Sequence, residues 1–490
     1  MADDSQNQGA TLCAEGRPGP AAEADAREED VGAGAGRRGA ADGVVSPDTP
    51  VTPASAHLFA EHLRRGAKPA AEWLCGVELE LFGYDARDPL APARLDPAAV
   101  ASLLVEFASG PGDLGYEDGQ LTETVNARGG RVTVEPGGQI EFSGAPQQTL
   151  VEVERGIKSF ISRLGEIAVE SDFIFLAAGF DPLRTIDEQQ WFPKMRYAVM
   201  RPYLATRGAR AWDMMCRTAA IQVSLDYNSE EDLAKKFALG NRLAPIITAM
   251  FANSPFADGK LSGYKSTRAA AWLETDDDRA GLAPSAITNN FSLDSFVEDA
   301  LQVPMLFVRR DGHYLDAPTG MPFGKFLEEG CGYLRPVFDD WLDHLTTLFT
   351  DARLRQHIEL RSADCGALPS TLALQALWKG LMYDDAALDA ALAIAPVINR
   401  EGAARLREEV ARHGLSARHE SINVLDVAKE ILMIAAAGLR RIAPDEVPYL
   451  DVLRQQVIED EVCPADILLR NWHGGWHTSM SKVVEYLRAA

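Results

Sequence analysis

The chain combines two hydrophobic patterns, each confined mainly to one part of the sequence. Short segments in which apolar and polar residues alternate, as they do in strands, lie mainly between Cys75 and Arg361. Segments with apolar residues at helical spacing dominate from about residue 372 onward. Because the strands and helices are largely segregated, the pattern favours an α+β fold with an antiparallel sheet, packed helices and a helical C-terminal region.

Several segments have the apolar spacing of amphipathic helices, and one of them shows a clear start signal. Ser229 is a suitable N-cap, and the three acids that follow it suit the positive end of the helix dipole. The predicted helices are Thr149–Ser171, Ser229–Leu243, Asp339–Leu348, Leu372–Met382, Asp385–Ile394, Ala403–His413 and Val424–Arg440.

Residues 1 to about 56 have a different composition, rich in Ala, Gly, Asp and Glu and poor in bulky apolar side chains. Such a segment cannot bury enough apolar surface to offset the entropy lost on ordering. We therefore expect a disordered tail over residues 1–56 and one folded domain over residues 57–490. Removing the tail up to about Ser55 is expected to leave activity nearly unchanged.

The charge balance excludes several classes of partner. The formal net charge is −24, from 48 basic and 72 acidic residues, so the surface repels nucleic-acid phosphates and anionic lipids. No window approaches the roughly 18 consecutive apolar residues of a membrane span. We therefore expect no nucleic-acid partner and no membrane partner.

The N-terminus and the cysteines bear on location and on metal chemistry. The N-terminus has no basic start with a following apolar stretch, and its acidity is unlike an Arg- and Ser-rich transit peptide. We therefore expect a cytoplasmic protein. The six cysteines are scattered without a CxxC pair, which favours neither a disulfide framework nor a zinc site.

The polar faces of the predicted strands carry many acids. In Val77–Leu81, Glu78 and Glu80 lie on one side of the strand and three aliphatic residues on the other. The strands Arg131–Glu135 and Gln139–Ser143 flank a Pro-Gly-Gly sequence that is typical of a hairpin turn. The polar positions of the other segments are Glu135, Glu141, the group Gln222, Ser224 and Asp226, and the group His357, Glu359 and Arg361.

One such face is ordinarily a solvated strand surface, but several together indicate a site. If the strands pair, their glutamates crowd one sheet face, where carboxylates a few Å apart repel by several kcal/mol. Such a cluster persists only if some acids are protonated or if cations lie among them. Glutamate and glutamine oxygens suit Mg²⁺ or Mn²⁺, and such ions in a cleft commonly neutralise a nucleoside triphosphate.

The sequence contains no GxxxxGK[ST] loop and no GxGxxG turn, so no glycine-rich loop would hold a nucleotide. No Ser/His/Asp or Cys/His arrangement indicates covalent catalysis. Arginines in loop-like or strand-edge stretches are suited to capturing carboxylate and phosphate, although each alone is more often a surface ion-pair residue. These arginines are Arg196, Arg201, Arg217, Arg268 and Arg279.

The same segments resemble the plant-type glutamate–cysteine ligase family, which also occurs in many bacteria. The resemblance runs in family order over roughly Glu72 to His477, and its most specific part is Glu135-Pro-Gly-Gly-Gln-Ile-Glu141. The other matching stretches are Gly76–Glu80, Arg196–Arg201, Asp213–Asp226, Phe251–Phe256, Ser266–Arg268 with Trp272, Thr275–Arg279, His344–Phe349 and Ile358–Arg361.

The resemblance implies a fold similar to glutamine synthetase, in which a concave antiparallel sheet cradles ATP and Mg²⁺ or Mn²⁺. Arg361 would contact the nucleotide phosphates, and Arg196 and Arg268 the substrate carboxylates. Trp272 would line the substrate site, and Arg279 would lie close to the nucleotide. Arg361 and Arg268 are the implied catalytic residues. The implied metal ligands are Glu78, Glu80, Glu135, Glu141, Gln222 and Glu359.

The implied reaction is ATP-dependent ligation of the glutamate γ-carboxylate to the cysteine amine through a γ-glutamyl phosphate. The partners would be glutamate, cysteine and ATP, and residues 57–490 would form the catalytic domain. A ligase of the same fold with a different amine, a guanidine or amino-acid kinase, and a catalytically silent binding module remain alternatives. The sequence leaves open whether the product serves glutathione or ergothioneine synthesis, and whether the chain is a monomer or a homodimer.

The sequence departs from the plant pattern at its cysteines. Ala219 and Ala317 stand where the plant pattern has cysteine, and Cys331 alone remains near the second position. The resemblance therefore does not extend to the redox disulfides of the plant enzymes.

Overall fold

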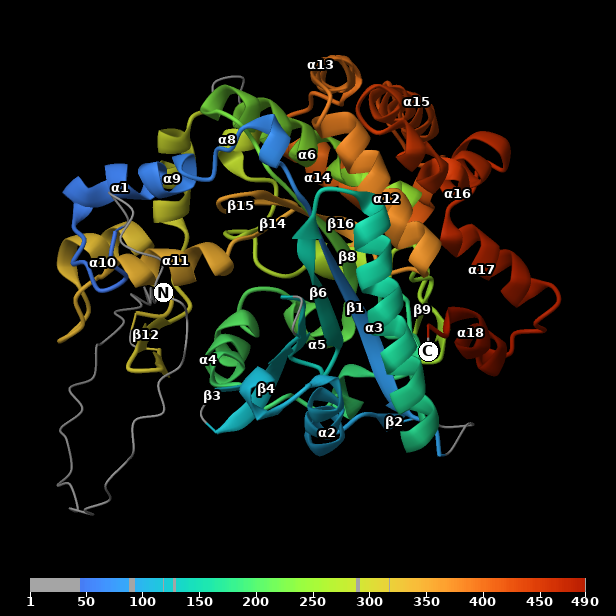
Figure 1. Cartoon of the computed structure of the whole chain (residues 1–490), viewed down its shortest axis with the longest axis horizontal. Helices are drawn as coiled ribbons and strands as arrows, with labels where there is room; N and C mark the ends of the chain where they lie inside the picture. The colour runs from blue at the N-terminus through green and yellow to red at the C-terminus, as the bar shows by residue number, and fades with distance from the viewer. Residues whose placement is uncertain are drawn as a thin grey trace, which may run out of the picture.

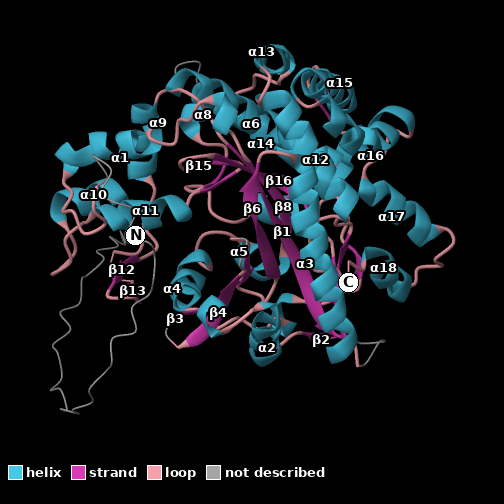
Figure 2. Cartoon of the chain, viewed as in Figure 1, coloured by secondary structure: helices cyan, strands magenta, loops and turns pink. Residues whose placement is uncertain are grey.

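The central feature of the fold is one large sheet with helices packed against it (Figure 1). The computed structural model describes residues 45–87, 93–117, 119–126, 129–287, 291–316 and 318–489. Most of the expected tail, residues 1–44, lies outside these ranges. The strands and helices form an α+β architecture (Figure 2), and helices dominate the chain from α12 (Leu368–Met382) onward, so the predicted fold class is confirmed.

The sheet has ten strands, and neighbouring strands pair antiparallel. Its strand order is β15-β16-β8-β1-β6-β5-β4-β3, and β2 and β7 pair with the C-terminal half of β1. The strands are β1 (Cys75–Asp85), β2 (Ala93–Arg94), β3 (Leu114–Glu117), β4 (Gln120–Val125), β5 (Arg131–Val134), β6 (Ile140–Gln147), β7 (Phe173–Leu176), β8 (Ala220–Leu225), β15 (Ala352–Leu354) and β16 (Ile358–Asp364).

One face of β1 is apolar and packs against two helices, α3 (Leu150–Ser171) and α12 (Leu368–Met382) (Figure 1). Val77, Leu79 and Leu81 are buried on this face. Burying each such side chain fully contributes about 1.5–3 kcal/mol. Because side chains alternate along a strand, this burial directs the intervening glutamates of β1 to the opposite face.

Further helices and four small sheets surround this centre. The helices are α1 (Ala56–Arg64), α2 (Pro97–Phe107), α4 (Met195–Leu204), α5 (Ala211–Arg217), α6 (Glu230–Met250), α7 (Thr267–Leu273), α8 (Pro284–Ile287), α9 (Leu293–Gln302), α10 (Phe323–Glu329), α11 (Phe338–Thr346), α13 (Asp385–Ile394), α14 (Arg400–His413), α15 (Val424–Ile442), α16 (Asp451–Leu453), α17 (Pro464–His473) and α18 (Met480–Leu487). The small sheets pair β9 (Phe256–Ala257) with β10 (Lys260–Leu261), β11 (Ala280–Gly281) with β14 (Phe349–Thr350), β12 (Val308–Arg310) with β13 (His313–Leu315), and β17 (Arg418–His419) with β18 (Ile422–Asn423). Among the described helices, none has both the length and the apolar character needed to cross a lipid bilayer.

Every predicted helix is present, and α13 has the predicted bounds. The loop-like interpretation of the arginine-bearing stretches is wrong for four of the five arginines. Arg196 and Arg201 lie in α4, Arg217 in α5 and Arg268 in α7. These helices span only seven to ten residues, which is too short for a hydrophobic period to stand out.

The N-terminal boundary also differs from the prediction, because the described residues before α1 are packed. Val51 is 2% exposed, and its backbone amide donates to the carbonyl of Pro336. The amide of Phe338, at the start of α11, donates to the carbonyl of Thr49. Contacts with a distant segment therefore order residues whose own composition predicts disorder.

Two N-terminal truncations should therefore differ in stability. Deleting residues 1–44 should leave unfolding free energy and turnover nearly unchanged, whereas deleting residues 1–55 should cost about 2–4 kcal/mol. This cost reflects one buried valine and the lost backbone hydrogen bonds. Urea denaturation of both proteins measures the difference. Equal stability of the two would show that residues 45–55 contribute nothing.

Candidate active site

The strand register places the predicted acids in two rows across the polar face of the sheet. In the first row, Glu78 of β1 pairs with Gln222 of β8 on one side and with Ser143 of β6 on the other. In the second row, Glu80 of β1 pairs with Glu141 of β6. The structure thus brings the strand-face acids together.

This face borders a cavity of about 450 Å³. Acids come mainly from the sheet, and basic side chains come from several elements. The lining acids are Glu78, Glu80, Glu135 and Glu141, and the lining bases are Arg131, Lys194, Arg196, Arg268, Arg353, Arg355 and Arg361. Such a combination suits polyanionic substrates together with metal cations.

The half-buried acids of this face repel one another. Burial, followed by the charges of Glu141 and Glu135, raises the pKa of Glu80 to about 8. Burial and Glu135 raise the pKa of Glu141 to about 7. Burial, with Glu359 and Glu141, raises the pKa of Glu78 well above its usual range. Carboxylate oxygens fit Mg²⁺ or Mn²⁺, and a cation among them would remove this repulsion.

Glu359 has a different environment from these acids, because two guanidinium groups cover it. It is 1% exposed, and Arg353, its partner across the β15–β16 pair, donates to its carboxylate at 2.7–3.1 Å. Arg361 donates to the same carboxylate. Although burial favours the neutral form, these arginines hold the pKa of Glu359 below its usual range.

Arg361 also donates to Oε1 of Gln222 at 2.5 Å. Glu359 and Gln222, two predicted metal ligands, are therefore engaged by the same guanidinium. Within the described ranges, no three acidic, histidine or cysteine side chains are grouped closely enough to hold an ion as they stand. The all-oxygen donor set fits Mg²⁺, but binding through all of it requires Arg361 to turn away.

The turn that carries Glu135 is locked to neighbouring elements. Glu135 follows β5 instead of lying within it, so the turn determines its position. The Gln139 side chain accepts from the Gly137 amide at 2.9 Å and donates to two carbonyls at the end of α5, at 2.9 and 3.2 Å. A Cβ at Gly137 would lie 2.3 Å from the carbonyl oxygen of Cys216, so the close approach to α5 requires glycine.

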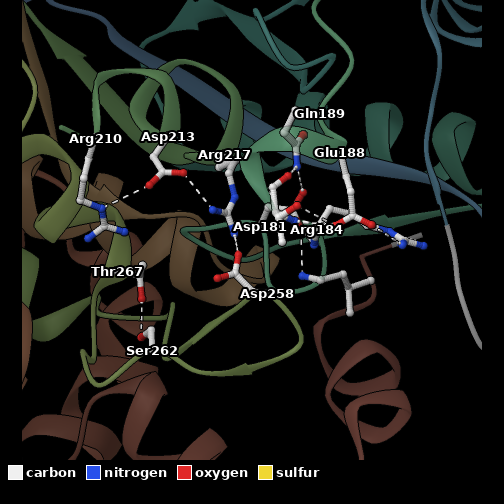
Figure 3. A network of polar contacts seen from close by, with 12 residues as sticks. Asp181, Arg184, Glu188, Gln189, Arg210, Asp213, Arg217, Asp258, Ser262 and Thr267 are labelled. Carbon is white, nitrogen blue, oxygen red and sulfur yellow. Dashed lines mark hydrogen bonds and ion pairs between the residues drawn. The ribbon is translucent and has the colours of Figure 1, made fainter. Parts of the chain in front are cut away.

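A network of ion pairs connects α5 to the segments around it (Figure 3). Arg217, the last residue of α5, donates to Asp213 at 2.8 Å and to Asp258, between β9 and β10, at 2.6 Å. Helix α5 leads into β8 with Gln222, and the β9–β10 hairpin precedes α7 with Arg268. The network therefore ties together two segments that present cavity residues.

The predicted substrate-binding residues Arg196, Arg268 and Trp272 all line the cavity. Arg268 is 5% exposed and donates to the carbonyl of Arg361 at 2.6 Å. Among the described residues, no acid lies within ion-pair distance of Arg268. Its remaining N–H groups are thus available to a carboxylate ligand.

Arg279 is not brought to the cavity, contrary to the prediction that it lies close to the nucleotide. Its guanidinium is buried and donates to Asp276 at 2.8 Å and to the carbonyls of Thr347 and Pro304. These contacts tie the segment after α7 to the loops that follow α9 and α11. The stretch Thr275–Arg279 matches the family pattern, and the structure gives Arg279 a structural role. Sequence spacing alone does not distinguish such a role from ligand binding.

Other basic residues of the cavity are not among the predicted site residues. Lys194 donates to the carbonyl of Val134 at 2.9 Å, and burial, opposed by Glu135, lowers its pKa. Arg353 and Arg355 precede β16 and alternate with Leu354, as the polar and apolar residues of β16 do. If the two segments are taken as the two strands of one hairpin, this shared alternation predicts both arginines on the cavity face.

The polar face of the antiparallel sheet thus gathers carboxylates beside many guanidinium groups, which is the arrangement that the resemblance predicts for a carboxylate–amine ligase. The sequence model of the family described as glutamate–cysteine ligase family 2 matches residues 74–485 of this chain. Glutamate–cysteine ligase A, chloroplastic, of Oryza sativa subsp. indica is 36% identical over 469 residues, 93% of each chain. The chain therefore belongs to glutamate–cysteine ligase family 2, and the predicted family and enzyme class are confirmed.

A second relative agrees with this assignment, and a solved structure supports the fold. The chloroplastic glutamate–cysteine ligase of Brassica juncea is 35% identical over 438 residues, 87% of this chain and 82% of the relative. The crystal structure of a glutamate–cysteine ligase from Francisella tularensis in complex with AMP matches with a TM-score of 0.52 and 14% identity. It covers 84% of this chain and 86% of that chain, and it supports the fold alone.

The expectation of a cytoplasmic protein is contradicted by these comparisons. Both plant relatives are named as chloroplastic. The expectation rests on the acidic composition of the N-terminus, most of which lies outside the described residues. Targeting segments are recognised by receptors, so composition is a weaker guide to compartment than it is to folding.

Proposed function

We propose that this chain joins the γ-carboxylate of glutamate to the amine of cysteine, with ATP as the energy source and Mg²⁺ as the metal. The observation that carries the proposal is the cavity in which half-buried glutamates lie beside many basic side chains. ATP and two amino-acid carboxylates need such cationic partners. The relatives named glutamate–cysteine ligase support this choice of substrates.

The acids of the sheet face would hold the metal. A bound Mg²⁺ would neutralise the triphosphate and stabilise charge on the transferred phosphoryl group. Arg361 would leave Glu359 and Gln222 for the nucleotide phosphates as the cation is bound. The proposed ligand set is Glu78, Glu80, Glu135, Glu141, Gln222 and Glu359.

The reaction needs positioning and charge neutralisation more than a protein nucleophile. An oxygen of the glutamate γ-carboxylate attacks the γ-phosphorus of ATP, and ADP leaves. The cysteine nitrogen then attacks the acyl carbon and loses a proton, and inorganic phosphate leaves with one former carboxylate oxygen. Arg268 and Arg196 would hold the carboxylates that do not react, and Trp272 would line the same site.

Product analysis tests this function. The purified protein should convert ATP, glutamate and cysteine into equal amounts of ADP and γ-glutamylcysteine. Other amino acids in place of cysteine should react more slowly. If ADP forms with glutamate and cysteine does not accelerate the reaction, the alternative ligase with a different amine is favoured. A stable phosphorylated product would indicate a kinase.

Replacing Arg268 by lysine should weaken binding of the amino-acid substrate by about 1–3 kcal/mol, because lysine cannot reproduce the two parallel hydrogen bonds of a guanidinium. The KM for ATP should stay within a few-fold of the parent value. Arg279→Lys is a matched control, since Arg279 is buried away from the cavity and should affect stability only. A variant impaired solely in its KM for ATP would assign Arg268 to the nucleotide.

A further inference from the structure

Arg94, the last residue of β2, has a buried guanidinium that is bonded to the turn carrying Glu135. It lies outside the lining of the proposed active-site cavity and is only 5% exposed. Its Nη2 donates to the carbonyl of Gly137 at 2.6 Å. Within the described ranges, its Nε and Nη1 are buried without a hydrogen-bond partner. The turn is therefore the main recipient of this charged donor.

An ion pair with the neighbouring acid does not account for Arg94. Asp181 is buried beside it, but the distance from Nε to Oδ2 of Asp181 is 3.9 Å, too long for a hydrogen bond. The Asp181 carboxylate is already occupied, because it accepts from the Tyr84 hydroxyl at 2.6 Å, from the Gln189 amide at 3.0 Å and from two backbone amides (Figure 3). Unpaired buried N–H groups are costly, so an arginine selected only for this acid would bond to it.

The turn transmits the position of Gly137 to Glu135. The Glu135 amide donates to the carbonyl of Gln139 at 2.9 Å, and the Gly138 amide donates to the carbonyl of Glu135 at 2.8 Å. These two bonds close residues 135–139 into one unit. A shift of the Gly137 carbonyl would therefore move Glu135, whose side chain lines the cavity.

Arg94 also relates the turn to the strand that carries the other acids. Strand β2 pairs with β1, with Arg94 opposite Tyr84, and β1 carries Glu78 and Glu80. The other contacts of the turn, from Gln139 and from the Phe192 amide, are neutral. A hydrogen bond from a charged donor is roughly twice as strong as a neutral one, so Arg94 is well suited to fix the turn relative to β1.

On the basis of the proposed function, we propose that Arg94 is a positioning residue, which holds the Glu135 carboxylate in the proposed metal site through the carbonyl of Gly137. Arg94 itself lines neither the cavity nor the row of acids on β1. Its loss should therefore act through Glu135. Groups that orient a metal ligand from outside typically change metal affinity or activity by about 10- to 100-fold.

Binding of Mn²⁺ to the metal-free protein, measured by electron paramagnetic resonance, tests this assignment without relying on turnover. Arg94→Met keeps an unbranched side chain against the rings of Phe82 and Tyr84 but has no donor for the turn. This variant should weaken Mn²⁺ binding ~10-fold. Arg94→Lys keeps a charge and a donor, so it should retain part of the affinity.

Glu135→Gln supplies the decisive comparison. If Arg94 acts through Glu135, Arg94→Met should weaken Mn²⁺ binding by less than ~2-fold in the Glu135→Gln background, because residues that act through one another are not additive. A general loss of stability would instead give the same loss of affinity in both backgrounds. That result, or an unchanged affinity of Arg94→Met in the parent background, would overturn the assignment.

Arg310→Met is the matched control. Arg310 of β12 also donates to a backbone carbonyl, that of Arg335 at 2.9 Å, and to a buried carboxylate, that of Asp340 at 2.6 and 2.7 Å, but it lies outside the cavity lining. This variant should lower the melting temperature and keep the Mn²⁺ affinity within ~2-fold, as expected for a distant site. An equal loss of affinity in Arg310→Met would also overturn the assignment.

The experiment separates this assignment from the proposed function. Arg94→Gln replaces Arg94→Met in the same comparison if the methionine variant does not fold. A parent protein that binds Mn²⁺ but forms no γ-glutamylcysteine would contradict the proposed function and leave the comparison of Mn²⁺ affinities valid. A parent protein that binds no Mn²⁺ would overturn the role of Arg94 together with the metal site.

Discussion

Replacing Glu78 or Glu80 by glutamine is expected to lower turnover by ~10²-fold or more and to raise the Mg²⁺ concentration required for activity. The physical reason is the loss of charge stabilisation at the metal, which is worth about 3 kcal/mol when one such interaction is removed. Titrating activity with Mg²⁺ for each variant measures both effects. Glu123→Gln, on β4 of the same sheet but outside the cavity lining, is the control and should leave the Mg²⁺ requirement unchanged. Unchanged Mg²⁺ dependence in both cavity variants would rule out the proposed ligands.

The same substitutions should stabilise the metal-free protein. The pKa of Glu80 is about 8 in the folded chain, above the value of 4.5 for an unperturbed glutamate, so the folded state retains a proton that the unfolded state has lost. Stability from this group is therefore present below about pH 4.5 and is lost as the pH rises toward 8. Glu80→Gln removes this pH-dependent loss of stability. The unfolding free energy of the variant should therefore exceed that of the parent by an amount that grows between pH 5 and pH 8. Mg²⁺ should reduce that difference.

Replacing Gly137 by alanine is expected to reduce turnover by ~10²-fold, although Gly137 contacts no proposed substrate. The added Cβ would meet the backbone of Cys216 at 2.3 Å, so the turn would have to move away from α5 and carry Glu135 with it. Displacing a site group by about 1 Å can cost ~10²-fold in rate. Overpacking should also destabilise the fold by about 1–3 kcal/mol.

Gly165→Ala is the matched control for this substitution. Gly165 lies within α3, and a Cβ there meets nothing within 4 Å. That variant should be as active as the parent and more stable by about 0.5–1 kcal/mol, because alanine favours the helix. If Gly137→Ala retains parental turnover and Mg²⁺ dependence, the position of Glu135 does not depend on the packing of this turn against α5.

The predictable part of the site follows from the period of two along each strand. Once Val77 and Leu79 are buried, Glu78 and Glu80 must share the opposite face, and the hydrophobic pattern alone contains that information. Glu141 joins them for the same reason, through its register with Glu80. The long helices are equally predictable, because several turns of apolar spacing accumulate in each.

Other features depend on contacts that sequence spacing does not contain. The short helices α4, α5 and α7 form where tertiary packing supplies most of the stability, so their arginines look like loop residues in the sequence. Glu359 has the same alternation as Glu78, yet Arg353 and Arg361 engage it. Whether an acid faces a cation site or an ion pair is decided by the neighbours that folding brings to it.

In the proposed reaction, ATP activates the γ-carboxylate of glutamate, and the γ-glutamyl group is then transferred to cysteine. Glutamate carrying ¹⁸O in both γ-carboxylate oxygens tests it most directly, with the phosphate and the peptide analysed by mass spectrometry. We expect one ¹⁸O in each phosphate released and one ¹⁸O in each γ-glutamylcysteine formed, with one ADP per peptide. Unlabelled phosphate, or ADP formed without γ-glutamylcysteine, would contradict the account.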